Sequence, residues 1–400
     1  MRVLFVTWAA PGHLLPMVPL AWAFQAAGHE VRVAGPPSCR KAVLGSGLSF
    51  VGVGDQAALA ALPAPPELAQ WGRPARWPSG WSAHLDLLAP DQRRVVRALY
   101  DKQCAAAELV LDDLVAFGTW WRPDLVVHDV LAMAGPVLAA RLGVPAVGHG
   151  WEIGSTLHSP TADRDGQPLP AYLRLFEKYG TAAVEPAGWV DPCPPAMRPP
   201  DGSPVRRLPV RCVPYNGAGT HPEWLTRRAG RPRVCVTAGI AGARYRDPGV
   251  QDVFALTLES LAATDAEIVL APGGPLGEER LPEGVRVVRG MPFRMLLPEC
   301  DLVVHHGGAG TALTAVACGV PQIVVPPSPI CTEIGHGVER AGAGVMTGRS
   351  DSGALLAQTA ADLLAAPEAH RGALDGLRAE LEALPAPAAL ADRLAALPAS

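Results

Sequence analysis

Lysine is the scarcest charged residue in this sequence, which carries only Lys41, Lys102 and Lys178. All charged residues together make up 18% of the chain, and the formal net charge at pH 7 is −4. A chain with this balance presents no strongly basic surface to nucleic acid or to an anionic membrane. We therefore expect neither of these as a partner.

The sequence also lacks closely paired cysteines and long apolar runs. Its eight cysteines are scattered, without any CxxC spacing: Cys39, Cys104, Cys193, Cys212, Cys235, Cys300, Cys318 and Cys331. This spacing is typical of a reducing cytoplasm and argues against disulfides and against a zinc site. The apolar run that begins at Val3 is too short for a secretory signal, and no run approaches the ~20 residues of a membrane span. We expect a cytoplasmic protein with no metal and no cofactor.

Four hundred residues exceed one ordinary hydrophobic core, so we expect two domains of about 200 residues each. Alternating strand and helix patterns in both halves predict α/β domains with doubly wound parallel sheets. We place an N-terminal domain at 1–214, a linker at 215–232, a C-terminal domain at 233–384 and a terminal helix at 385–400. The stretch 153–230 has little periodicity of its own.

One glycine-rich stretch in the C-terminal half carries the strongest signal. Leu302–Val304 is predicted as a strand, Gly307, Gly308 and Gly310 as a tight turn, and Ala309–Cys318 as a helix. Such a turn directs unpaired N–H groups and the positive end of the helix dipole at one point, which suits a phosphate. Thr311 adds a hydroxyl donor, and His306 can donate to a phosphate oxygen. A plain strand-to-helix turn is the alternative, and the adjacent histidines favour phosphate binding over it.

The N-terminus repeats the strand-turn-helix pattern without the glycines. Val3–Thr7 is predicted as a strand, Ala9–His13 as the turn after it, and Pro16–Ala27 as a helix. Residues in this turn lie above the carboxyl edge of the sheet, where such folds bind ligands. His13 is therefore well placed, although a turn histidine is more often a surface or capping residue. Asp129 ends another predicted strand at the same edge.

The stretch 54–90 interrupts the alternation and is longer than an ordinary connection. It contains Trp71, Trp77 and Trp81 among many Pro and Ala residues. Long insertions above a parallel sheet are usually binding loops, so the three tryptophans predict a flat, apolar acceptor pocket. Part of their burial must be structural.

The motifs together resemble the two-domain GT-B fold of bacterial natural-product glycosyltransferases. The run from His305 to Thr311 looks like the nucleotide-sugar signature of that family, and Gly12-His13 looks like its first loop. The linker with Val213-Pro-Tyr-Asn216, and the strand with Arg233-Val-Cys-Val-Thr237, resemble the deoxysugar transferases that act on polyketides. The resemblance extends from residue 1 to about 380, and the stretch from His149 to Trp151 belongs to it.

The resemblance implies a role for each matching residue. His13 would be the general base, with Asp129 orienting it, and Trp71, Trp77, Trp81 and Trp151 would line the acceptor site. The remaining matching residues would bind the donor: Thr237, Gly239, His306, Gly308, Gly310 and Thr311 at the diphosphate, and Met291 at the nucleobase.

The chain departs from the family pattern before Met291, where many relatives carry an aromatic residue that stacks on the base and this chain has Gly290, and at two further positions. Relatives that use fully hydroxylated sugars carry an Asp-Gln pair where this chain has Ile330-Cys331. An unpartnered sugar hydroxyl buried against apolar groups is penalised, so the substitution favours a deoxysugar. Glu333 could instead take over the contact with the sugar. We expect dTDP-activated 6-deoxy- or 2,6-dideoxysugars to be better donors than UDP-glucose.

These features predict an inverting hexosyltransferase that moves a deoxysugar from a nucleoside diphosphate, dTDP in our expectation, to a hydrophobic polyketide-type acceptor in antibiotic biosynthesis. The helix-end N–H groups and His306 would stabilise the leaving diphosphate without a metal. Two rival readings remain: a nucleotide-sugar epimerase or hydrolase on the same fold, and a catalytically silent nucleotide-sugar-binding helper protein. The first has no need of the tryptophan-rich insertion, and the second has no need of both His13 and Asp129. The aglycone, the sugar, O- or C-linkage, an auxiliary protein and a homodimer are left open.

Overall fold

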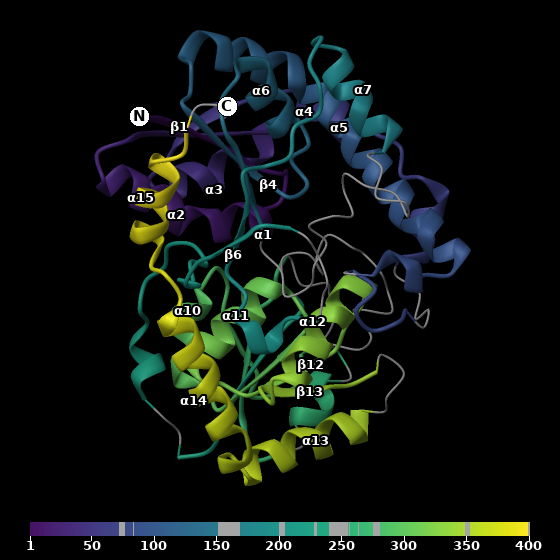
Figure 1. The fold of residues 1–400 in the computed structure, drawn as a ribbon. Coiled ribbons are helices and arrows are strands. Elements are labelled where there is room, and N and C mark those ends of the chain that lie inside the picture. Colours follow the sequence, from purple (N-terminus) through teal and green to yellow (C-terminus); the bar gives the residue numbers. More distant parts are fainter. Residues whose placement is uncertain are drawn as a thin grey trace.

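The computed structural model describes residues 1–71, 77–82, 84–150, 169–199, 205–227, 230–239, 255, 257–262, 264–274, 281–348 and 353–398. Two parallel sheets organise these residues, one in each half of the chain (Figure 1). This arrangement confirms the prediction of two doubly wound α/β domains. The limits placed on the domains and on the linker remain a prediction.

The N-terminal sheet has seven strands, and every recorded pairing is parallel. In spatial order they are β3 (Ser49–Gly52), β2 (Glu30–Gly35), β1 (Arg2–Val6), β4 (Leu125–Asp129), β5 (Ala146–His149), β6 (Trp189–Asp191) and β7 (Arg207–Pro209). The central strands are apolar, β-branched runs buried on both faces, as parallel sheets covered by helices require. Because the order changes direction between β1 and β4, the loops that follow these two strands lie side by side at the carboxyl edge.

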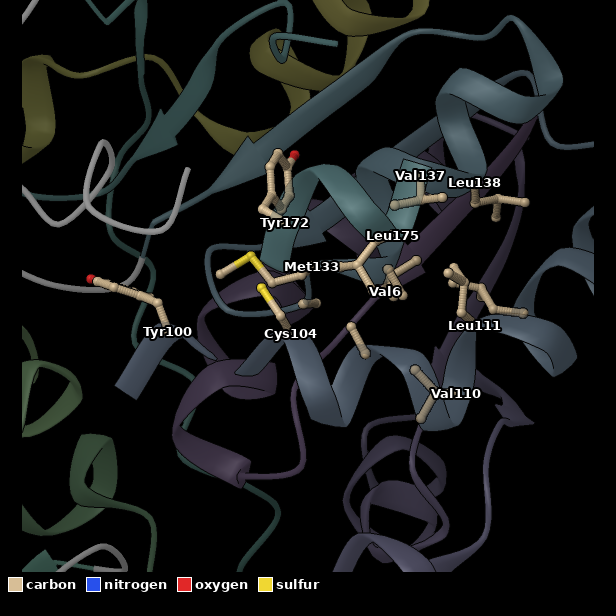
Figure 2. Packing of buried hydrophobic residues seen from close by; sticks show 14 of the residues in the cluster. Val6, Tyr100, Cys104, Val110, Leu111, Met133, Val137, Leu138, Tyr172 and Leu175 are labelled. Carbon is tan, nitrogen blue, oxygen red and sulfur yellow. The ribbon is translucent and has the colours of Figure 1, made fainter. Parts of the chain in front are cut away.

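Helices cover this sheet on both sides. Their bounds are α1 (Pro11–Leu14), α2 (Val18–Ala26), α3 (Arg40–Gly45), α4 (Gln56–Ala60), α5 (Pro90–Trp121), α6 (Ala134–Leu142) and α7 (Pro170–Glu177). One hydrophobic cluster lies between the sheet and helices α5, α6 and α7; Figure 2 shows side chains of these helices converging near Val6 of β1. The other cluster lies on the opposite face, under α2.

The C-terminal sheet has six strands and is also parallel in every recorded pairing. In spatial order they are β10 (Arg286–Val287), β9 (Glu267–Leu270), β8 (Arg233–Thr237), β11 (Leu302–His305), β12 (Gln322–Val324) and β13 (Gly344–Met346). Its described helices are α10 (Phe293–Leu296), α11 (Ala309–Cys318), α12 (Pro329–Arg340), α13 (Gly353–Ala365), α14 (Glu368–Ala383) and α15 (Pro387–Ala395). The switch of direction falls between β8 and β11, which again brings two turns together.

The predicted terminal helix is α15, and it packs on the other domain. Leu390, Ala391 and Leu394 are buried in the cluster under α2 of the N-terminal domain. Figure 1 shows α15 beside α2, at the end of a chain path that leads up from α14. The end of the described chain therefore ties the two domains together.

One local prediction was wrong, and one stretch holds elements that its sequence pattern does not indicate. The stretch 9–13 was predicted as a turn, but Pro11–Leu14 forms the short helix α1, because Pro11 at its first position has a backbone angle already suited to a helix. The stretch 153–230 has little periodicity in sequence, yet α7, β6 and β7 lie within it. Strands of three residues are too short to produce a readable alternation.

Candidate active site

A histidine and a carboxylate meet at the carboxyl edge of the N-terminal sheet. Asp129 is the last residue of β4 and is fully buried, while His13 lies on α1, just after the adjacent strand β1. The Nδ1 atom of His13 is 3.0 Å from both carboxylate oxygens of Asp129. The backbone N–H of Leu131 donates to Asp129 Oδ1 at 2.9 Å and fixes the carboxylate further.

This contact decides which nitrogen of His13 is basic. An ionised carboxylate can only accept hydrogen bonds, so Nδ1 carries the proton and Nε2 is the nitrogen able to take up another. The charge of Asp129 also stabilises the imidazolium that forms when Nε2 is protonated. The side chain of His13 retains 13% of its accessible surface, whereas that of Asp129 retains none. Asp129 is therefore buried behind His13, and His13 still reaches solvent.

Two further histidines lie beside this pair but are held neutral. His149 is the register partner of Asp129 on β5, and His128 precedes Asp129 on β4. Burial lowers the pKa of each imidazole to about 4, against the opposing effect of the Asp129 charge. His128 packs edge-to-face on Trp189, with ring centroids 5.6 Å apart. Neither side chain is a cation near neutral pH, so neither competes with His13 as a positive partner of Asp129. Neither of them was predicted to have a role in the site.

The glycine-rich turn of the C-terminal domain surrounds His306. A Cβ added to Gly239 would lie 2.0 Å from Cε1 of this ring, and one added to Gly308 would lie 2.7 Å from the same atom. The turns after β8 and β11 therefore both approach the ring so closely that only glycine is accommodated. Gly239 also has a φ of +65°, which favours glycine independently.

The electrostatic state of His306 follows from its burial. Burial first, and the neighbouring His305 second, lower its pKa to about 3, so the ring is neutral near pH 7. Its Nδ1 atom is buried and has no hydrogen-bond partner among the described residues. A neutral imidazole with an unpartnered nitrogen can donate one N–H to an anionic ligand.

His305 has a different environment. Its Nε2 is 2.9 Å from Gln322 Oε1, and its Nδ1 accepts from the backbone N–H of Gly307 at 3.1 Å. Both ring nitrogens are thus used to hold the turn, so His305 supports the structure of the motif while His306 faces the glycines.

The remaining donor-side residues lie around the same turn. Gly308 is the N-cap of α11, and its first turn contains Gly310 and Thr311 without a side-chain cap among the described residues. Thr237 is buried at the end of β8, and its hydroxyl accepts from the N–H of Gly239 at 3.0 Å. The positive end of the α11 dipole and the two glycine turns therefore converge at His306.

The linker contributes a side chain that the sequence analysis missed. Asn216 donates from Nδ2 to Thr314 Oγ1 at 3.3 Å and accepts at Oδ1 from the N–H of Arg294 at 3.0 Å. It thereby joins α11 to α10, which begins two residues after Met291. Met291 is half-buried and packs against the hydrophobic cluster that includes Leu296. An asparagine in a Pro- and Gly-rich linker gives no signal of this kind in the sequence.

The three described tryptophans of the insertion pack on one another. Ring centroids lie 5.5 Å apart for Trp71 and Trp77, and 4.9 Å apart for Trp77 and Trp81, all edge-to-face. Trp77 and Trp81 are buried in the large N-terminal cluster, and Trp71 is half-buried against it. Much of their surface is therefore used inside the protein. Trp151 lies outside the described residues.

The positions that depart from the family pattern lie at the start of α12. Ile330 packs against the N-terminal cluster that contains Trp77 and Trp81. A Cβ added to Gly307 would lie 2.7 Å from the carbonyl oxygen of Cys331, so this residue lies directly on the glycine turn. Glu333, one turn further, is buried, and both of its carboxylate oxygens lie 3.0 Å from the backbone nitrogen of Gly80.

Within the described ranges, no group of three or more His, Cys, Asp and Glu side chains is arranged to hold a metal ion. The helices that the structure describes include none that is long and apolar enough to cross a membrane.

Comparison with known proteins assigns the family. Residues 22–239 match the N-terminal domain, and residues 255–397 the C-terminal domain, of erythromycin biosynthesis protein CIII-like proteins. The chain is 36% identical over 402 residues to an L-demethylnoviosyl transferase from Streptomyces niveus, covering 99% of this chain and 98% of that protein. It is 34% identical over 429 residues to the TDP-daunosamine transferase DnrS from Streptomyces peucetius, covering 100% and 97% of the two chains.

A solved structure agrees over the whole length. The spinosyn rhamnosyltransferase SpnG complexed with thymidine diphosphate matches with a TM-score of 0.79 at 28% identity, covering 99% of this chain and 100% of that one. Its two-domain architecture is the one described above. The chain belongs to the erythromycin biosynthesis protein CIII-like family and is a glycosyltransferase with the GT-B fold.

Proposed function

We propose that this enzyme transfers a deoxysugar from a dTDP donor to a hydrophobic polyketide-type acceptor, with inversion at the anomeric carbon. The observation that carries the proposal is the bond from His13 Nδ1 to both oxygens of the buried Asp129. This arrangement prepares Nε2 to remove a proton from an acceptor that lies against α1. A positioned base of this kind contributes roughly 10²–10⁴-fold to a rate.

The reaction is a single displacement. Nε2 of His13 takes the proton of the acceptor nucleophile as that atom bonds to the anomeric carbon, and the bond from the anomeric carbon to the diphosphate oxygen breaks on the opposite side. One displacement inverts the configuration. The proton remains on His13, whose positive charge is balanced by Asp129.

The departing diphosphate gains negative charge during this step. The first turn of α11 and the neutral ring of His306 supply donors at one point, and they stabilise the charge where it develops. The names of the relatives support thymidine diphosphate as the leaving group, since one is a TDP-daunosamine transferase and one matched structure holds thymidine diphosphate.

The preference for a deoxysugar rests on Ile330 and Cys331. Cys331 lies against the glycine turn, so the start of α12 borders the place of the diphosphate and its attached sugar. Neither an isoleucine nor a cysteine side chain offers a strong partner to a sugar hydroxyl. A donor that lacks hydroxyls on this side loses no hydrogen bond when it leaves water.

A hydrophobic acceptor is supported by a small cavity next to the catalytic pair. The loop after β1 contributes Trp8, the loop after β4 contributes Leu131 and Met133, and α5 contributes Ala107 and Val110. The lining is almost wholly apolar, and it begins two residues beyond Asp129. Apolar side chains therefore border the catalytic pair on this side, which suits a hydrophobic acceptor.

The test is an incubation of the enzyme with dTDP-deoxysugars and a panel of polyketide aglycones. Mass spectrometry should detect aglycones that gain one deoxysugar, and NMR of the product should give the anomeric configuration opposite to that of the donor. Retained configuration would contradict the single displacement. Release of free sugar or of an epimerised nucleotide sugar, with every aglycone unchanged, would favour the hydrolase or epimerase reading.

A further inference from the structure

Glu333 connects the C-terminal domain to the tryptophan-bearing insertion at 54–90. Among the residues that the structure describes, it is the one buried carboxylate of that domain in contact with the insertion. Its two oxygens share the backbone N–H of Gly80, 253 residues away in sequence, at 3.0 Å each. The hydroxyl of Ser82 lies 3.5 Å from Oε2. Glu333 itself is only 4% exposed. This contact between the two domains is therefore buried from solvent.

Gly80 occupies the turn between two of the tryptophans. Its φ of +78° reverses the chain after Trp77 and directs Trp81 back into the N-terminal cluster, where it is 1% exposed. The rings of Trp77 and Trp81 then pack with centroids 4.9 Å apart. Because the turn joins the two rings, an anchor on the Gly80 N–H fixes the place at which both rings pack in the cluster.

The opposite end of the contact is attached to the donor side. Glu333 lies in the first turns of α12, whose Cys331 carbonyl borders the Gly307 turn. Ile330, on the same helix, packs against the cluster that contains Trp77 and Trp81. Figure 1 shows α12 on the side of the C-terminal domain that faces the N-terminal domain. One helix thus contacts both the glycine turn and the insertion.

The chemistry of the contact distinguishes it from sugar binding. Both carboxylate oxygens are already hydrogen-bonded within the protein, and burial raises the pKa of Glu333 to about 7 against the opposing effects of the Gly80 N–H, Arg340 and Ser82. Since both oxygens face the Gly80 N–H, the carboxyl group is directed at the insertion. Its physical effect is to hold the insertion at a defined place relative to α12.

We propose that Glu333 is a positioning residue, which holds the Trp77–Trp81 turn against α12 and so determines acceptor binding rather than donor recognition. The inference rests on the proposed transfer to a hydrophobic acceptor, whose apolar cavity shares Ala107, Val110 and Met133 with the large N-terminal cluster that holds the tryptophans of the insertion. It assigns to Glu333 a role in KM for the acceptor and none in affinity for the nucleotide.

The experiment compares three variants. Glu333→Ala removes the acceptor of the Gly80 N–H, Glu333→Gln keeps a carbonyl oxygen for it, and Glu339→Ala is the matched control. Glu339 lies on the same helix and also accepts a backbone N–H at 3.0 Å, but from Met346 of β13 and not from the insertion. Steady-state kinetics gives kcat and KM for acceptor and donor, and calorimetry gives the affinity for dTDP.

We expect Glu333→Ala to raise the acceptor KM by roughly tenfold, the loss expected when one buried N–H loses its partner. Its dTDP affinity should stay within about twofold of the native value. Glu333→Gln should return most of the acceptor affinity, and Glu339→Ala should leave the acceptor KM unchanged. If Glu333→Ala instead raises the donor KM and leaves the acceptor KM unchanged, Glu333 reads the sugar and the inference is wrong. Unchanged values for both substrates would overturn it equally.

Amide hydrogen exchange tests the contact between Glu333 and Gly80 independently of the proposed sugar transfer. The Gly80 amide should be protected in the native chain and in Glu333→Gln, and exposed in Glu333→Ala, with no substrate present. A protein that transfers no sugar at all would refute the proposed function, while the exchange result would still decide the contact. Equal protection of Gly80 in all three proteins would show that Glu333 does not hold the turn.

Discussion

Replacing Gly239 by alanine should disable the diphosphate site through His306. The added Cβ would lie 2.0 Å from Cε1 of that ring and 2.7 Å from its Nδ1, well inside van der Waals contact. The Gly239 φ of +65° adds a left-handed backbone penalty of roughly 1–2 kcal/mol for any L-residue. The ring has to leave its place between the two glycine turns. A hydrogen bond from His306 to the charged diphosphate, worth about 1.5–3 kcal/mol, is then lost, which weakens binding by roughly 10- to 150-fold.

Calorimetric titration with dTDP measures this loss, and Gly143→Ala supplies the matched control. Gly143 has nearly the same φ, +67°, but a Cβ there meets no atom within 4 Å. Both variants should lose similar stability to the backbone penalty, and only Gly239→Ala should lose affinity for dTDP. In a His306→Ala background, which should itself bind dTDP weakly, Gly239→Ala should add little further loss. Native dTDP affinity in a folded Gly239→Ala protein would refute the assignment of His306 to the diphosphate.

The remaining predictions concern pH and donor choice. His306 has a folded-state pKa of about 3, below its ordinary 6.5, so its contribution to stability is complete above pH 6.5 and is lost as the pH falls toward the folded value. Between pH 7.5 and 5 the native chain should lose about 2 kcal/mol of its free energy of unfolding through this histidine. In urea unfolding, His306→Gln should lose about that much less stability over the same pH range, and an equal loss in both proteins would contradict the neutral ring. For donor choice, the native enzyme should use dTDP-6-deoxyglucose over dTDP-glucose at least roughly tenfold better in kcat/KM, since one unmade buried hydrogen bond costs about 1–3 kcal/mol. Cys331→Gln should narrow that ratio, and equal use of both donors by the native enzyme would show that another residue reads the sugar. Cys331 is the cleaner of the two positions to change, because Ile330 also packs on the N-terminal cluster.

The sequence predicted the parts of the fold that depend on local pattern. Buried β-branched strands such as Val303–Val304 and glycine-ended helices such as α11 follow from periodicity and from the left-handed C-cap at Gly319. The two parallel-sheet domains follow from the alternation of these elements. The short strands β6 and β7 could not be found in this way, because the pairing of β6 with β5 and of β7 with β6, rather than their own sequence, makes them strands.

The candidate site was predictable where the residues of a motif are adjacent in sequence, and less so where the chain brings distant residues together. His13 and Asp129 could be placed at one sheet edge, since both follow strands, but their 3.0 Å contact depends on α1, which was predicted as a turn. The links made by Asn216 and Glu333 depend on how the linker and the domains pack. Neither residue lies in a sequence pattern that indicates its hydrogen-bond partner.

The contribution of His13 can be measured most directly by single-turnover transfer in His13→Ala, with dTDP affinity measured on the same preparation. His13 lies on the N-terminal domain and the glycine turn on the C-terminal domain, so the two properties should separate. We expect the rate of sugar transfer to fall by roughly 10²–10⁴-fold, the usual worth of a general base, while dTDP binding stays within about twofold of native. A folded His13→Ala protein that transfers sugar at the native rate would contradict the account.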